Sequence, residues 1–250
     1  MKSFLKKIIF VFSVAPSILA GQTRENDSMF YVWFDQVIGL EHTGLNNGKQ
    51  FVNLDANKIF EDKHPYFYSN DPLKGSITYD GQTYYDINMK YNQEIDALIV
   101  KLNSPSAPSI IQLVSDKVES FVINNFKFIR LESIKTNTHF VSGFHQVLLE
   151  SDELMVLKRQ KKSKSKHIET SESNRLYYEY LGVTKYILFY EGMYKNIKSK
   201  SDIIKIFPEA KEKIRKFYKT HKRLLKKEHD LFLIRLFDQI ITPSVSKNEF

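Results

Sequence analysis

The side chains best suited to bind a ligand form a basic run in the middle of the chain. The run extends from Lys158 to Lys166 and contains no apolar residue. Its basic members are Lys158, Arg159, Lys161, Lys162, Lys164 and Lys166. This composition predicts a solvated, mobile loop. Such a loop could contact an anionic surface, although electrostatic attraction of this kind is unspecific. A simply solvated charged segment is the interpretation that the sequence favours.

The histidines do not have the spacing of a metal site. Zinc ligands usually come in close pairs, such as two histidines one helical turn apart. His139 and His145 are six positions apart, and Ser142-Gly143 interrupts the segment between them. His221 and His229 lie eight apart in a segment of helical pattern, with a predicted break between them. We therefore expect no metal and no cofactor.

Signatures of covalent catalysis are also missing from the sequence. There is no Gly-x-Ser-x-Gly turn, no glycine-rich phosphate loop and no cysteine. Acidic pairs such as Asp152 with Glu153, or Asp35 with Glu41, could act as acid and base. Any chain with 29 acidic residues contains such pairs by chance, so we assign no catalytic residue.

The first 20 residues have the pattern of a secretory signal peptide. Lys2, Lys6 and Lys7 precede the apolar run Ile8–Val14, and Ala20 supplies a small residue for cleavage. The run is too short for a membrane-spanning helix, which needs roughly 20 apolar residues. The sequence thus predicts export to the periplasm or cell surface, where a nucleic-acid partner is not expected. A cysteine-free exported chain must also fold by packing rather than by disulfides.

Four short turn signals divide the middle of the chain into strands. Asp80-Gly81 is the strongest of them, because both residues tolerate the positive φ angles of a type I′ turn. The turn candidates are Asp80-Gly81, Asn124-Asn125, Ser151-Asp152-Glu153 and Glu191-Gly192. Strands at this spacing predict an antiparallel meander that forms a sandwich or an open barrel.

Two further segments near the N-terminus carry local signals. Gly21–Ser28 is polar and is expected to be a flexible leader, whereas Met29–Ile38 is aromatic and fits either a strand or a short helix in the core. From Tyr85 the residues alternate, which predicts one buried face. That face would consist of Tyr85, Ile87, Met89 and Tyr91.

Beyond residue 197 the pattern becomes helical and basic. Ser199 or Ser201 can cap a helix that begins near Asp202, and Pro208 interrupts it and suits the first turn of a second helix. Helical periodicity then continues to about Phe237, with a break expected near residues 228–230. We therefore predict a mainly β (α+β) fold with a basic helical C-terminal segment. The units are a signal peptide (1–20), an antiparallel β domain (21–197), a helical segment packed on it (198–241) and a flexible tail (242–250).

Several segments resemble a family of small, uncharacterised exported proteins of Bacteroidetes-type Gram-negative bacteria. The similar segments are 41–48, 75–85, 112–121, 142–144, 198–200 and 206–209, in the same order along the chain. The resemblance implies export and a β-then-helix layout. The family has no known activity, so the resemblance transfers no functional residue.

These observations favour a non-enzymatic periplasmic or cell-surface binding or scaffold module. Its partner would be an envelope protein or an anionic envelope surface. A cell-envelope hydrolase with an unrecognised site is the first alternative. A peripheral membrane protein that uses its basic helices is the second.

Overall fold

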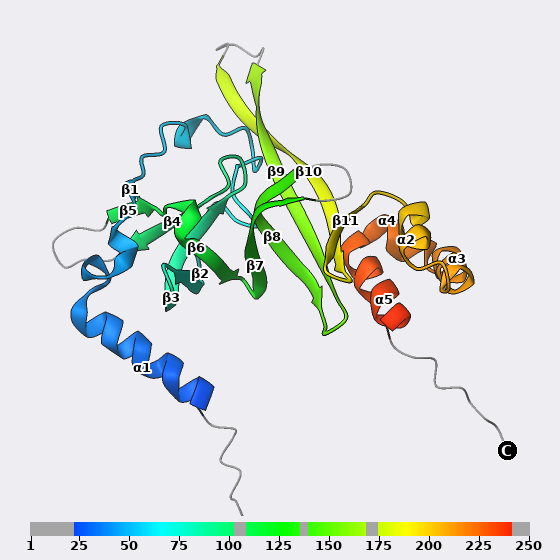
Figure 1. The fold of residues 1–250 in the computed structure, drawn as a ribbon. Helices are drawn as coiled ribbons and strands as arrows, with labels where there is room; N and C mark the ends of the chain where they lie inside the picture. The colour runs from blue at the N-terminus through cyan, green and yellow to red at the C-terminus, as the bar shows by residue number, and fades with distance from the viewer. Residues whose placement is uncertain (1–22, 103–108, 136–139, 169–174, 242–250) are drawn as a thin grey trace, which may run out of the picture.

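The computed structural model describes residues 23–102, 109–135, 140–168 and 175–241 (Figure 1). The predicted signal peptide (1–20), the Pro-containing loop at 104–108 and the tail at 242–250 lie outside these residues. Export and cleavage therefore stay predictions.

The described strands form one open antiparallel sheet (Figure 1). Their spatial order is β1-β5-β4-β3-β2-β6-β7-β8-β9-β10-β11. The strands are β1 (Lys49–Gln50), β2 (Leu73–Tyr79), β3 (Gln82–Asn92), β4 (Ala97–Leu102), β5 (Ser109–Gln112), β6 (Val118–Ile123), β7 (Phe126–Lys135), β8 (Phe140–Glu150), β9 (Leu154–Ile168), β10 (Leu176–Tyr190) and β11 (Met193–Ile197). The predicted mainly antiparallel β fold with a C-terminal helical segment is confirmed, and the sheet is open rather than a closed barrel.

All four predicted hairpin turns are present. Asp80-Gly81 joins β2 to β3 with φ angles of 53° and 80°, and Asn124-Asn125 joins β6 to β7 with 48° and 63°. Glu191-Gly192 joins β10 to β11 with 51° and 72°. Positive φ at both central residues matches the right-handed twist of the flanking strands. Ser151 closes the β8–β9 turn by exchanging backbone and side-chain hydrogen bonds with Leu154.

A β-bulge in β3 corrects one predicted face. Gly75 of β2 pairs with Ile87 and Ile77 pairs with Tyr84, so β3 has one residue more than β2 between these two pairs. Asp86 takes a φ of 55° at this point. A bulge shifts the alternation by one residue. Tyr84 is therefore buried in place of Tyr85, whereas the later positions Ile87, Met89 and Tyr91 are buried as predicted.

The main core is rich in aromatic rings. Phe121 and Phe128 are stacked with their ring centroids 4.7 Å apart. Tyr91 and Phe144 contact Phe121 edge-on, at 5.3 and 5.2 Å. Offset and edge-to-face pairs of this kind stabilise a core beyond the area that they bury.

The C-terminal helices pack against strands β8–β11 (Figure 1). They are α2 (Lys200–Ile206), α3 (Lys211–Thr220), α4 (Lys222–Lys227) and α5 (His229–Ile241). Phe232 and Phe237 are fully buried in a cluster with Val156 and Leu188 of the sheet. The break predicted near residues 228–230 is present between α4 and α5, whereas Pro208 lies before α3 rather than in its first turn.

Polar contacts also hold the helices on the sheet. The Asp230 carboxylate accepts hydrogen bonds from Nζ of Lys158 at 2.6 Å and from the Tyr186 hydroxyl at 2.7 Å. The two donors lie opposite each other on β9 and β10. Asp230 thus fixes the start of α5 against this strand pair.

Replacing Ser199 by alanine is expected to lower the free energy of unfolding by about 1 kcal/mol. Ser199 is the N-cap of α2, and it forms a capping box with Asp202. Ser201, the other predicted cap, is exposed within the first turn and serves as the control. Urea unfolding of Ser199→Ala and Ser201→Ala measures the difference. Equal losses in the two variants would show that the box contributes nothing.

The N-terminal helix α1 (Thr23–Ile38) departs from the sequence prediction. Residues 23–28, expected to be a flexible leader, are helical. Residues 29–38 form a helix but not a core element, since the Trp33 side chain is 58% exposed. The segment contacts β3 and the short 3₁₀ turn at Leu40–His42. Further 3₁₀ turns lie at Gly44–Asn46, Ala56–Lys58 and Ser115–Lys117.

Candidate functional site

The predicted basic loop is a strand. Residues 158–166 lie within β9 and pair with β10 over their whole length. The prediction was wrong because charged side chains do not prevent strand pairing. In a two-stranded ribbon the charged side chains can project into solvent from both faces, while the backbone groups of the two strands form hydrogen bonds with each other. In β9 the even positions face one way and the odd positions the other.

Three of the six basic residues form ion pairs within the protein. Lys158 pairs with Asp230, as described above, and Nη2 of Arg159 lies 3.1 Å from Oδ2 of Asp96. Lys164 pairs with Asp55 and also lies over the Tyr178 ring, 3.8 Å from its centroid. These charges tie β9 to distant parts of the chain.

The other three basic residues differ in their environment. Nζ of Lys162 donates to the backbone oxygens of His64 and Tyr66, both at 2.8 Å, and burial lowers its pKa. Lys161 and Lys166 are exposed and form no ion pair with any described residue. The six predicted contact residues are therefore not gathered on one surface. Contact with an anionic surface stays a prediction.

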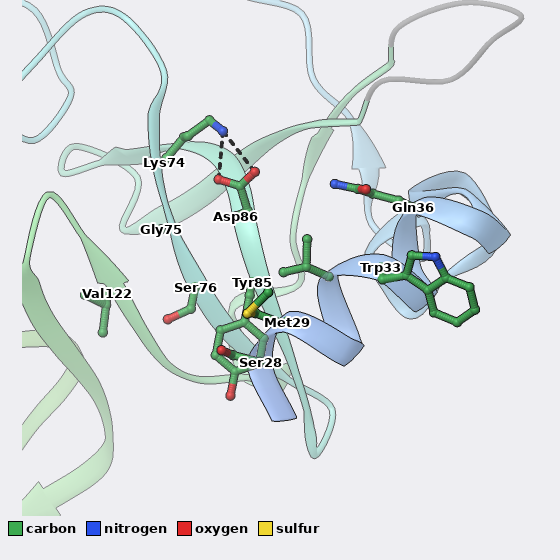
Figure 2. Close-up of a pocket in the computed structure, with 11 residues that line it drawn as sticks. Ser28, Met29, Trp33, Gln36, Lys74, Gly75, Ser76, Tyr85, Asp86 and Val122 are labelled. Atoms are coloured by element: carbon green, nitrogen blue, oxygen red, sulfur yellow. Dashed lines mark hydrogen bonds and ion pairs between the residues drawn. The ribbon is translucent and has the colours of Figure 1, made fainter. Parts of the chain in front are cut away.

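An open cavity lies between α1 and the sheet (Figure 2). Its volume is about 680 Å³. From the helix it is lined by Met29, Val32 and Trp33, and from the sheet by Tyr85 and Val122. Figure 2 shows the ion pair between Lys74 and Asp86 at its upper edge, with 2.8 Å between Nζ and Oδ1. The bulge at Asp86 thus contributes to the site, because it turns Tyr85 out of the core and toward the helix.

The exposed surface of α1 is apolar and aromatic. Its exposed large side chains are Met29, Phe30, Tyr31, Trp33, Phe34, Val37 and Ile38. Met29 is the most exposed, at 72%. In Figure 2 the Trp33 ring projects from the side of the helix away from the strands. A contiguous apolar patch of this kind on a protein surface usually marks an interaction site.

The side of α1 that faces the protein contains a buried carboxyl group. Asp35 is buried, and its Oδ2 atom has no hydrogen-bond partner among the described residues. Burial raises the pKa of Asp35. Burial also raises the pKa of Tyr84 in β3, and the nearby Asp35 charge adds to that effect. α1 thus exposes many apolar side chains and buries a carboxyl group, unlike a typical soluble surface helix, which buries its apolar face and exposes its polar one.

A second group of perturbed residues lies around His145 of β8. The His145 ring is fully buried, and burial lowers its pKa to about 4. Its Nδ1 atom is 2.9 Å from the Gly143 carbonyl oxygen. The nearby Asp96 carboxylate accepts from the Tyr91 hydroxyl at 2.6 Å and from Arg159. Asp96 is thus engaged by these two groups.

This group does not have the geometry of acid–base catalysis. A general base must reach the proton that it removes, and its pKa should lie near the working pH. His145 is inaccessible to substrate and remains neutral far below pH 7. Among the described residues, no three histidine or acidic side chains are grouped closely enough to hold a metal ion.

Comparison with family models, curated proteins and solved structures finds no match to this chain. The resemblance to exported Bacteroidetes-type proteins therefore stays a prediction. Within the described part of the chain, no helix combines the length and hydropathy needed to cross a membrane.

Proposed function

We propose that this protein is an exported, non-enzymatic binding module that docks another protein of the cell envelope through α1. The observation that carries the proposal is the exposed apolar surface of α1, with seven large apolar side chains exposed and a carboxyl group buried. Leaving these side chains in water is unfavourable, and a partner that covered them would recover roughly 25 cal/mol for each Å² of apolar area. The cavity beside α1 offers space for side chains of that partner.

The chemistry of α1 favours a protein partner over a lipid surface. Helices that lie on anionic membranes are usually rich in lysine and arginine on their polar face. The α1 sequence contains one basic residue, Arg24, against Glu25, Asp27 and Asp35. Its net negative charge would be repelled by anionic lipid. Trp, Tyr, Phe and Met are also the residue types enriched at the centres of protein interfaces.

The single tryptophan of the chain provides a direct test of this docking. Trp33 is the only tryptophan, so its fluorescence reports on α1 alone. With 7-azatryptophan incorporated at position 33 and excited to the red of ordinary tryptophan, we expect its emission to shift to shorter wavelength when solubilised envelope proteins are added. We expect no such shift with phosphatidylglycerol vesicles. The partner is then identified by crosslinking and mass spectrometry under the conditions that give the shift.

The Phe30→Gln/Phe34→Gln variant should weaken that binding by about 30-fold or more, because one buried aromatic anchor already contributes roughly 2 kcal/mol. The two rings are stacked on one side of α1, 6.3 Å apart, and the variant keeps Trp33 as reporter. Val52→Gln/Leu54→Gln removes two exposed apolar side chains elsewhere and should bind like the wild type. Equal binding by both variants would contradict docking through α1.

The vesicle measurement distinguishes the proposed protein partner from the alternative that this is a peripheral membrane protein. A Trp33 shift with vesicles would identify α1 as a lipid-binding helix. Vesicle binding without a Trp33 shift, and weakening with added salt, would instead favour the exposed lysines of α3 and α4. A Trp33 shift with vesicles would contradict the proposed protein partner.

A further inference from the structure

Like charges face each other on one side of the β9–β10 pair. Lys185 pairs directly with Arg159, and Val183 pairs with Lys161. Residues two apart on a strand share a face, so Arg159, Lys161 and Lys185 all lie on the same side. Directly opposed like charges destabilise a sheet. A negative charge placed between these cations would therefore stabilise the arrangement.

The protein supplies only part of that compensation. Asp96 pairs with Arg159, and the side chains of both residues are mostly buried. Lys161 and Lys185 are exposed, and neither forms an ion pair with a described residue. Two positive charges thus stay uncompensated beside the Arg159 guanidinium.

These three cations line a cavity of about 370 Å³. Ser163 of β9 and Asn196 of β11 add polar groups to its wall, and Val183 and Ile187 of β10 add an apolar part. None of the described residues that line it is acidic. The volume falls in the range of pockets that hold small organic molecules. The cavity lies on the face of the sheet opposite to Lys158 and Tyr186, which contact α5.

The buried ring at this cavity has an unused acceptor. His145 is among the lining residues. Because the Gly143 carbonyl can only accept, Nδ1 of the neutral ring carries the proton and Nε2 has a lone pair. Nε2 has no hydrogen-bond partner within the described chain. Because the His145 ring is fully buried, a ligand in the cavity does not reach this atom, and binding depends on the three cations.

We propose that this cavity binds a small organic molecule that carries a phosphate or carboxylate group and a short apolar group. The anionic oxygens lie between Lys161, Lys185 and Arg159, where both strands of the pair present cations. The apolar group lies against Val183 and Ile187. This ligand site is separate from α1 and does not depend on the proposed docking function.

Calorimetric titration of the purified protein with simple probes tests the site. Phenyl phosphate and benzoate supply the two anionic groups on an apolar ring, inorganic phosphate lacks the ring, and benzyl alcohol lacks the charge. We expect at least one of the two aromatic anions to bind, more tightly than inorganic phosphate, and benzyl alcohol not to bind. Failure of both aromatic anions to bind would overturn the proposal.

The Lys161→Gln/Lys185→Gln variant locates the binding. The variant should bind the aromatic anion at least about tenfold more weakly, because it loses the charge-assisted hydrogen bonds from two cations. Lys222→Gln/Lys226→Gln removes the same charge from the exposed surface of α4 and should leave the affinity unchanged, as should Phe30→Gln/Phe34→Gln. Equal weakening in the α4 variant would mean unspecific attraction and would overturn the site.

The thermal stability of the free protein provides a second readout. Lys185→Gln removes one of two opposed cations, so it should raise the midpoint of thermal unfolding by about 1–4 °C. If Lys185 stabilised the fold, its replacement would instead lower the midpoint of thermal unfolding. A lower midpoint would therefore contradict the inference that these charges are kept for a ligand.

Discussion

Replacing Gly143 by alanine is expected to lower the free energy of unfolding by about 3 kcal/mol or more. Gly143 has a φ of 92° within β8, a conformation that costs an alanine roughly 1–2 kcal/mol. A Cβ atom at this position would also overlap Oδ2 of Asp96 and lie 3.0 Å from Nη2 of Arg159. The carboxylate cannot move away freely, because the Tyr91 hydroxyl holds its other oxygen.

Gly192→Ala separates the backbone strain from the overlap. Gly192 has a φ of 72°, but no atom lies within 4 Å of the position that a Cβ atom would take, so this variant should lose only about 1–2 kcal/mol. Urea unfolding of both variants measures the difference. Equal losses would show that the Asp96–Arg159 pair shifts without cost, and the network around His145 would then be looser than the structure indicates.

Phe121→Ala should destabilise the protein by about 4 kcal/mol, since removal of a buried phenylalanine typically costs roughly 3–5 kcal/mol when the cavity does not collapse fully. Phe121 is 1% exposed and contacts the rings of Tyr91, Phe128 and Phe144, each within 5.3 Å between centroids. The alanine variant loses all three aromatic contacts together.

Phe126→Ala is the matched control, since it makes the same substitution near the β6–β7 turn. Phe126 is 36% exposed and packs mainly on Phe67 and Tyr68, so its loss should cost about 1–2 kcal/mol. Chemical unfolding at constant pH compares the two. A Phe121→Ala loss no larger than that of Phe126→Ala would contradict the assignment of this cluster as the centre of the core.

Local chemistry was sufficient to predict the hairpins, the start of α2 and the break between α4 and α5. A two-residue turn such as Asp80-Gly81 depends on the φ angles that its own residues tolerate, and the Ser199 cap depends on bonds to residues close by in the sequence. These features need no knowledge of the rest of the chain. The antiparallel meander and the helical C-terminal segment follow from the order of such local units.

The faces of the strands were predictable only where pairing is regular. The bulge at Asp86 lies between the Gly75–Ile87 and Ile77–Tyr84 pairs, so it depends on the register of β3 with β2. No pattern within the segment itself indicates the extra residue. The sequence pattern therefore could not show that Tyr84, rather than Tyr85, is buried in the core.

The candidate sites depended even more on distant contacts. Lys185 lies two positions from the apolar Val183 and Ile187, so the strand pattern only places the three side chains on one face of β10. Its position opposite Arg159 follows only from the register of β9 and β10.

The sequence by itself determined where the hairpins turn, where α2 begins and that most of the chain pairs as antiparallel strands, because these depend on neighbouring residues. The tertiary structure alone decided that the basic run is a paired strand and that the aromatic α1 is exposed. The physical reason is that burial and charge compensation depend on which surfaces the folded chain brings together.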